Sequence, residues 1–159
     1  MPLLLIDHQV GLLQLVRDAS PEEFRNNVLG LAKTAKLFEF PVILTTSLDW
    51  GPNGPILPEL KALFPDVATI RRPGVINAWR WPAFRDAVDA LNRTKLIIAA
   101  MTDSTCLQFP ALDAVLEGFD VHGVIRSIVR LMPHSTNCAG GWKNNDAAQI
   151  PAPTPNPVR

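Results

Sequence analysis

Three short apolar runs, separated by segments with helical spacing, constrain the fold of this chain more than any other feature. The runs cover residues 3–6, 42–46 and 95–100. They lack the alternation of a half-exposed strand and are typical of strands buried on both faces. Strands that alternate with helices form parallel βαβ units. We therefore predict an α/β fold, with a mainly parallel sheet inside three α-β-α layers of Rossmann-like topology.

The clearest helix start lies at Ser20. Ser20 is suited to the N-cap, Pro21 to the first helical position, and Glu23 completes a capping box, whereas Pro41 ends the segment. Pro110 is expected to bend a later helix. Further helices are predicted at 57–64, 82–91 and 103–117, and further strands at 68–72 and 120–124.

Composition excludes several classes of function. The chain has 159 residues, 47% of them hydrophobic, which indicates one globular domain. Its net charge of zero gives no basic patch for nucleic acid. The apolar run that ends at Asp7 is too short to span a membrane. Cys106 and Cys138 form neither a disulfide framework nor a metal spacing, so we expect a cytoplasmic protein with no metal or cofactor.

The pattern changes near residue 124. We predict one folded α/β core at 1–124 and a divergent, partly disordered, proline-rich tail at 125–159. The C-terminal part of the fold is thus expected to be atypical or truncated.

Polar residues follow several of the predicted strands. Asp7, Ser47, Arg72 and Cys106 all fall at carboxyl ends, where function gathers in parallel sheets. Cys106 lies in the first turn of a predicted helix, and such a position lowers a thiol pKa. Each residue also has an ordinary alternative: a strand cap, a solvated cation or a buried cysteine.

Several ordered motifs resemble one family. They are Leu4-Leu5-Ile6-Asp7-His8-Gln9, Arg72-Pro73-Gly74-Val75-Ile76-Asn77-Ala78-Trp79 and Ala99-Ala100-Met101-Thr102-Asp103-Ser104-Thr105-Cys106. Their order and spacing over residues 3–124 resemble the isochorismatase-like cysteine hydrolases, and in particular the YcaC-type branch.

That resemblance implies a catalytic triad of Asp7, Arg72 and Cys106. Asp7 would take the thiol proton and later activate water, Cys106 would attack a carbonyl carbon, and Arg72 would act by its charge, at a position where most of the family has lysine. Arg71 is the alternative inward-pointing cation.

The resemblance also implies surroundings for the triad. It implies a cis peptide at Met101–Thr102 and an oxyanion hole formed by Thr102 and Cys106. Further expected residues are the substrate-binding walls Ser47, Asn77, Trp79 and Phe109. It implies a homo-oligomer and no catalytic metal.

The predicted function is hydrolysis of a small amide or related C–N bond through a thioester. The alternative is a catalytically impaired member of the family that acts as an oligomeric or small-molecule-binding protein. A redox-sensing thiol is a third, weaker reading, since no motif places a second cysteine beside Cys106.

Overall fold

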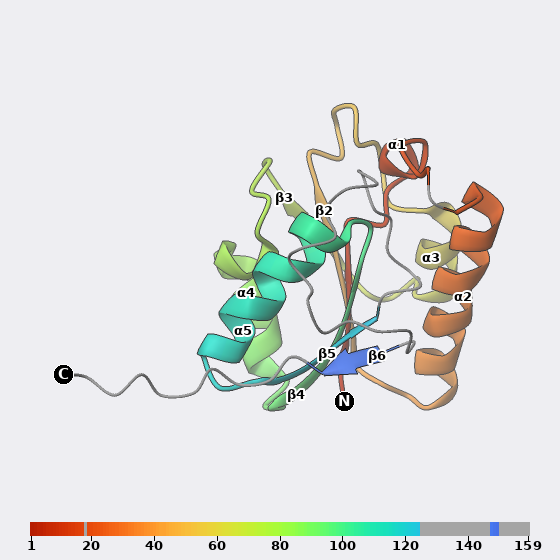
Figure 1. Ribbon diagram of the computed structural model, residues 1–159. Helices are drawn as coiled ribbons and strands as arrows, with labels where there is room; N and C mark the ends of the chain where they lie inside the picture. The colour runs from red at the N-terminus through yellow and green to blue at the C-terminus, as the bar shows by residue number, and fades with distance from the viewer. Residues whose placement is uncertain (18, 125–146, 150–159) are drawn as a thin grey trace.

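A six-stranded sheet forms the centre of the computed structural model, which describes residues 1–17, 19–124 and 147–149 (Figure 1). The strands are β1 (Leu3–Ile6), β2 (Val42–Ser47), β3 (Thr69–Arg72), β4 (Lys95–Ala100), β5 (Asp120–Val124) and β6 (Ala147–Gln149). Their order is β3-β2-β1-β4-β5-β6. The first five are parallel, and β6 pairs antiparallel with β5. The predicted α/β fold with a mainly parallel sheet is confirmed.

Helices cover both faces of this sheet. They are α1 (Val10–Leu13), α2 (Pro21–Leu37), α3 (Pro58–Leu63), α4 (Pro82–Ala90) and α5 (Gln108–Leu116). Figure 1 shows α2 and α3 on one face and α4 and α5 on the other. The capping prediction holds at α2, where Ser20 Oγ accepts from the Glu23 N–H at 3.0 Å. In the described ranges, no helix has the length and apolar character needed to cross a membrane.

Strand β1 shows why the apolar runs lack alternation. All four of its side chains are completely buried. Leu4 and Ile6 belong to the core beneath α4 and α5, whereas Leu3 and Leu5 belong to the core beneath α2 and α3. Because successive side chains on a strand point to opposite faces, a strand covered on both faces must be apolar throughout.

The predicted continuous helix at 103–117 is wrong in one respect. A π turn spans Asp103–Leu107, and the regular helix α5 begins only at Gln108. In the π turn, the Leu107 N–H donates to the Thr102 carbonyl at 3.0 Å. Pro110 explains the wider turn, because it has no N–H and its ring clashes with the carbonyl four residues earlier, that of Cys106.

The predicted tail lies mostly outside the described residues, namely at 125–146 and 150–159. Within it, β6 is a strand that the sequence pattern did not predict.

Candidate active site

The sheet order changes direction at β1. Strand β1 pairs with β2 on one side and with β4 on the other, so the crossovers from it run in opposite directions. Ligand sites in such sheets lie at this switch point. Asp7 follows β1 and the turn with Cys106 follows β4, and the Met101 N–H binds the Ile6 carbonyl at 3.0 Å. The predicted convergence of polar residues at this edge is confirmed.

Asp7 ends β1 in a left-handed conformation, with φ of 60°. Aspartate is one of the few non-glycine residues that adopt this region without severe strain. Two backbone hydrogen bonds hold it: its N–H donates to the Thr45 carbonyl at 2.9 Å, and its carbonyl accepts from the Gln9 N–H at 2.8 Å. The side chain is 2% exposed, so the carboxyl group is fixed inside the protein.

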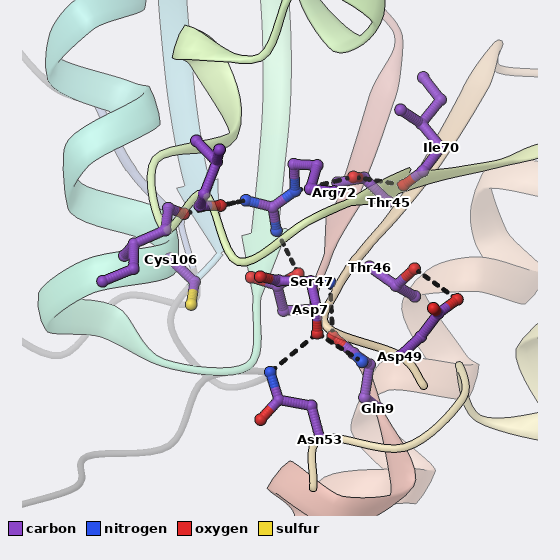
Figure 2. Close-up of polar contacts among 12 residues, drawn as sticks. Asp7, Gln9, Thr45, Thr46, Ser47, Asp49, Asn53, Ile70, Arg72 and Cys106 are labelled. Carbon is purple, nitrogen blue, oxygen red and sulfur yellow. Dashed lines mark hydrogen bonds and ion pairs between the residues drawn. The ribbon is translucent and has the colours of Figure 1, made fainter. Parts of the chain in front are cut away.

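Arg72 reaches Asp7 by crossing a whole strand. Arg72 ends β3, and β2 lies between β3 and β1, so the two residues are separated by two strand spacings, about 10 Å. On the way, the Arg72 Nε donates to Thr45 Oγ1 at 3.0 Å, and Thr45 Oγ1 donates to the Ile70 carbonyl at 2.8 Å. The guanidinium then forms an ion pair with Asp7 and binds the Val75 and Ile76 carbonyls (Figure 2).

The structure decides between the two adjacent arginines. Arg72 is fully buried, whereas the Arg71 side chain is 60% exposed. Arg71 forms an ion pair with Asp49 at 2.7 Å, and its guanidinium carbon lies 5.7 Å from the centre of the Trp50 ring. Strand alternation is the cause, because neighbouring residues on β3 point to opposite sides.

Cys106 lies in the π turn with its sulfur on the side of Asp7 (Figure 2). The residue is 8% exposed, and the charge of the Asp7 carboxyl group acts on its thiol. Thr105 Oγ1 is 3.6 Å from Cys106 Sγ. At the buried edge of the sheet, Asp7 is therefore paired with the Arg72 guanidinium, and the Cys106 sulfur lies on the side of Asp7 (Figure 2).

Burial raises the pKa values of both Asp7 and Cys106. Burial, and then the charge of Asp7, raise the pKa of Cys106 to about 11, against hydrogen bonds from Thr102 and Thr105. Burial also raises the pKa of Asp7, and the Arg72 charge opposes it. The expectation that the helix start lowers the thiol pKa is therefore wrong, because desolvation and a neighbouring carboxylate outweigh it.

The peptide before the nucleophile turn also differs from expectation. No cis peptide bond occurs in the described part of the chain, so the predicted cis bond at Met101–Thr102 is wrong. Thr102 is extended, with φ of −123° and ψ of 139°, and this ordinary conformation leads from β4 into the π turn. The Cys106 N–H, predicted for an oxyanion hole, donates to Thr102 Oγ1 at 3.3 Å.

The four predicted pocket residues lie in different surroundings. Ser47 is buried at the end of β2. Asn77 and Phe109 line a hollow of about 480 Å³ beside α5, and the Asn77 amide donates to Asp113 at 2.8 Å. Trp79 is only 3% exposed and packs against Phe84 and Phe119. Its Nε1 donates to Glu117 beyond the far end of α5, so the structure places Trp79 in the core.

Gln9 is a site residue for which the sequence motif predicted no role. Its amide donates to the Ser47 carbonyl at 3.0 Å and to the Gly54 carbonyl at 2.6 Å, and accepts from the Ser47 N–H at 2.9 Å. Asn53 adds a hydrogen bond to the same Ser47 carbonyl at 2.8 Å. Gln9 lies two residues after Asp7, so these hydrogen bonds hold the loop after β2 against the segment that follows Asp7. The spacing Asp-x-Gln was the only available signal.

Among the residues that the structure describes, no group of three or more His, Cys, Asp or Glu side chains is arranged to hold a metal ion.

Comparison with known proteins supplies the relatives of this site. No family model matches the chain. A curated protein of Escherichia coli K12, "Probable hydrolase YcaC", is 58% identical over 118 residues, which are 74% of this chain and 57% of that protein. The solved structure of the E. coli YcaC gene product, described as an octameric hydrolase of unknown specificity, is 53% identical with a TM-score of 0.79 over 82% of this chain and 64% of that one.

A second solved structure is YcaC from Pseudomonas aeruginosa with hexane-2,5-diol and covalent acrylamide. It is 52% identical with a TM-score of 0.80, over 83% of this chain and 65% of that one. More distant isochorismatase-family structures share the fold alone. The chain thus spans less than two thirds of the length of these YcaC relatives.

The sheet order, the edge with Asp7, Arg72 and Cys106, and these matches define the class: an isochorismatase-like α/β protein. Within that class, the chain is a relative of the YcaC branch, as its motifs predicted.

Proposed function

We propose that this chain carries the site of a cysteine hydrolase that cleaves a small amide or related C–N bond through a thioester. The observation that carries the proposal is the buried arrangement of Arg72, Asp7 and Cys106, in which a fixed cation contacts the base and the base acts electrostatically on the nucleophile. The relatives support it, since E. coli YcaC is named a probable hydrolase and the P. aeruginosa structure holds covalent acrylamide.

The first half of the reaction forms the thioester. Asp7 accepts the thiol proton as the Cys106 sulfur attacks the carbonyl carbon, and the carbonyl π electrons move to oxygen. The tetrahedral species then re-forms its C=O bond and breaks the C–N bond. The nitrogen leaves with the proton that Asp7 held, which leaves an acyl group on Cys106.

The second half uses water. Asp7 takes a proton from water as the water oxygen attacks the thioester carbon, and the C–S bond breaks. The sulfur recovers the proton from Asp7, and a carboxylic acid leaves. Proton transfer in both halves suits a carboxyl group whose pKa is raised by burial, because such a group is a stronger base.

Arg72 has an electrostatic role in this scheme. Its guanidinium stays protonated, so it holds Asp7 in place without exchanging protons. Its charge also lowers the free-energy cost of burying the Asp7 carboxylate. Thr102 and Cys106 remain the proposed oxyanion donors. The Cys106 N–H would then be shared between Thr102 Oγ1 and the substrate oxygen.

The substrate-binding residues proposed here are Ser47 and Phe109, with Asn77 acting through the short 3₁₀ helix Ala78–Arg80 that it caps. Phe109 follows Cys106 by three residues and is 43% exposed, which suits a pocket wall. The Asn77 amide is already engaged by Asp113, which suits a supporting role. A cytoplasmic location stays a prediction.

Acrylamide provides the test, because it labels thiolates and needs no knowledge of the substrate. We expect the adduct, mapped by mass spectrometry, on Cys106, and unaffected labelling in the control Cys138→Ser. Asp7→Asn should keep the label, because loss of its charge lowers the thiol pKa, but should lose amide turnover. Release of ammonia from a panel of small primary amides should stop in Cys106→Ser. Labelling at Cys138 alone, or turnover by Cys106→Ser, would refute the proposed mechanism.

The alternative, a catalytically impaired protein that binds small molecules, is favoured by one observation. Burial and the Asp7 charge raise the pKa of Cys106 to about 11, which leaves little thiolate at neutral pH. Labelling of Cys106 without turnover of any amide in the panel would select this alternative.

Self-association is the proposed partnership. Ile76, Phe109, Leu112 and Leu116 are 43–69% exposed beside the hollow along α5. An apolar face of this kind is typical of a subunit contact, and the E. coli relative is described as octameric. Light scattering should show that Leu116→Lys lowers the molecular mass. Leu37→Lys, at an exposed leucine of α2, is the control, and dissociation by that variant instead would overturn the choice of face.

A further inference from the structure

Two threonine hydroxyls and the Cys106 sulfur form a series of short contacts. Thr102 Oγ1 lies 2.7 Å from Thr105 Oγ1, and Thr105 Oγ1 lies 3.6 Å from Cys106 Sγ. Thr102 Oγ1 also accepts from the Cys106 N–H at 3.3 Å. The π turn creates this arrangement, because it brings Thr102, Thr105 and Cys106 around one loop of backbone.

Two hydrogen arrangements use every contact while the thiol is protonated, but only one remains once the thiol proton has left, and it has Thr105 donating to sulfur. A hydroxyl has one hydrogen to donate and two lone pairs to accept with. Thr102 accepts from the Cys106 N–H and donates to Thr105, which leaves the Thr105 hydrogen free to point at sulfur. Each contact then has one donor and one acceptor.

The sulfur needs such a donor. Cys106 is 8% exposed, so water offers its thiolate little solvation. Asp7 on β1 faces the sulfur with a like charge, and the Arg72 guanidinium is engaged by Asp7 and by backbone carbonyls. Two other titratable residues belong to these segments. In the same turn, the Asp103 carboxylate accepts from the Ser104 N–H at 2.6 Å. In the other segment, His8 directly follows Asp7.

We propose that Thr102 and Thr105 form a two-hydroxyl relay that donates a hydrogen bond to the Cys106 sulfur and serve as positioning residues for the nucleophile. This inference rests on the proposed role of Cys106. A thiol sulfur is a weak acceptor and a thiolate a strong one, so the relay strengthens as the proton leaves for Asp7. It therefore assists the step that forms the nucleophile more than it stabilises the resting protein.

The relay also accounts for the direction of one electrostatic effect. Burial and the Asp7 charge raise the pKa of Cys106, and the neighbouring hydroxyls of Thr102 and Thr105 act against both, Thr102 through Thr105. The two hydroxyls thus offset part of the cost of a buried thiolate beside a carboxylate.

The test replaces the hydroxyl and keeps the shape. Thr105→Val removes the donor with almost no change in volume, and Thr105→Ser keeps it. In a Cys138→Ser background, the rate of acrylamide labelling at Cys106 is measured against pH by mass spectrometry. Loss of one hydrogen bond to a thiolate should slow labelling roughly tenfold below the thiol pKa and move the profile to higher pH. Thr105→Ser should follow the parent protein.

The outcomes separate the relay from the proposed function. Labelling of Cys106 with identical profiles in the parent and in Thr105→Val would overturn the relay and leave the nucleophile in place. Labelling that avoids Cys106 in the parent would overturn the proposed function itself. Thr102→Val is the second variant: it should slow labelling in the same direction, and an unchanged profile would remove Thr102 from the relay. Matching circular dichroism spectra confirm that the variants are folded.

Discussion

Replacing Arg72 by methionine tests the electrostatics of the whole site. Arg72→Met keeps the apolar stem of the side chain and removes its charged guanidinium group. The variant leaves the Asp7 carboxyl group buried without its cation, and it also removes the donor to Thr45 Oγ1 and to the Val75 and Ile76 carbonyls. Breaking a buried ion pair by removing one partner costs about 3–5 kcal/mol, so we expect a loss of about 4 kcal/mol in the free energy of unfolding at neutral pH.

The pH dependence gives the sharper test. The pKa of Asp7 in the folded protein lies above its ordinary value of 3.8, because burial outweighs the attraction of Arg72. The folded state therefore holds this proton more tightly, and its stability falls as the pH rises from about 4 through the folded-state pKa. In Arg72→Met the opposing attraction is gone and the pKa rises further, so the fall continues to higher pH.

Urea unfolding across this pH range measures the effect. The stability difference between the parent and Arg72→Met should be smallest in acid, where Asp7 is neutral in both proteins and only the Arg72 hydrogen bonds to Thr45, Val75 and Ile76 are lost, and should grow toward neutral pH. Adding Asp7→Asn to Arg72→Met should recover part of the loss, because the unpaired carboxylate is then removed. A difference below about 1 kcal/mol, the value of an exposed pair, that also stays constant with pH would refute the buried pair.

Three further predictions concern the surroundings of the site. Gln9→Leu leaves the Ser47 N–H and the Ser47 and Gly54 carbonyls without the amide, and should cost about 3 kcal/mol and speed hydrogen exchange in residues 48–56. Unaltered exchange there would argue against the Gln9 anchor. Gly11→Ala would place a Cβ 2.0 Å from the Pro52 carbonyl oxygen and should cost about 1–3 kcal/mol in thermal unfolding. The control Gly30→Ala, where a Cβ meets nothing within 4 Å in the middle of α2, should stabilise by about 0.5–1 kcal/mol. Trp79→Ala should cost about 3–5 kcal/mol and Trp79→Phe far less, since the core contacts with Phe84 and Phe119 outweigh the bond to Glu117. Equal losses would contradict that placement.

Local pattern was sufficient where one segment decides its own structure. The α2 cap depends on Ser20 and Glu23, three residues apart, and the prediction of it was correct. The helix after β4 was predicted less well. Pro110 indicated a bend, but the widening into a π turn at Asp103–Leu107 depends on how the turn meets β1 as well as on the proline.

The site shows the same division. Its three main residues were predicted from motifs that each follow a strand, and the sheet order brought them together. Trp79 was misjudged as a pocket wall, because a tryptophan near such a motif has the same sequence signal whether it faces a pocket or packs in the core. Thr45 was passed over within an apolar run, although its hydroxyl supports Arg72 between β3 and β1.

By itself, the sequence determined the alternation of buried strands and helices, because the period of apolar residues and the caps are local properties. It therefore also determined that Asp7, Arg72 and Cys106 follow strands of one sheet. Only the tertiary structure decided that Arg72 and not Arg71 turns inward, and that burial beside Asp7 raises the pKa of the thiol that the helix start was expected to lower. Desolvation and charge proximity depend on every element packed around a group, and no single segment of sequence contains that information.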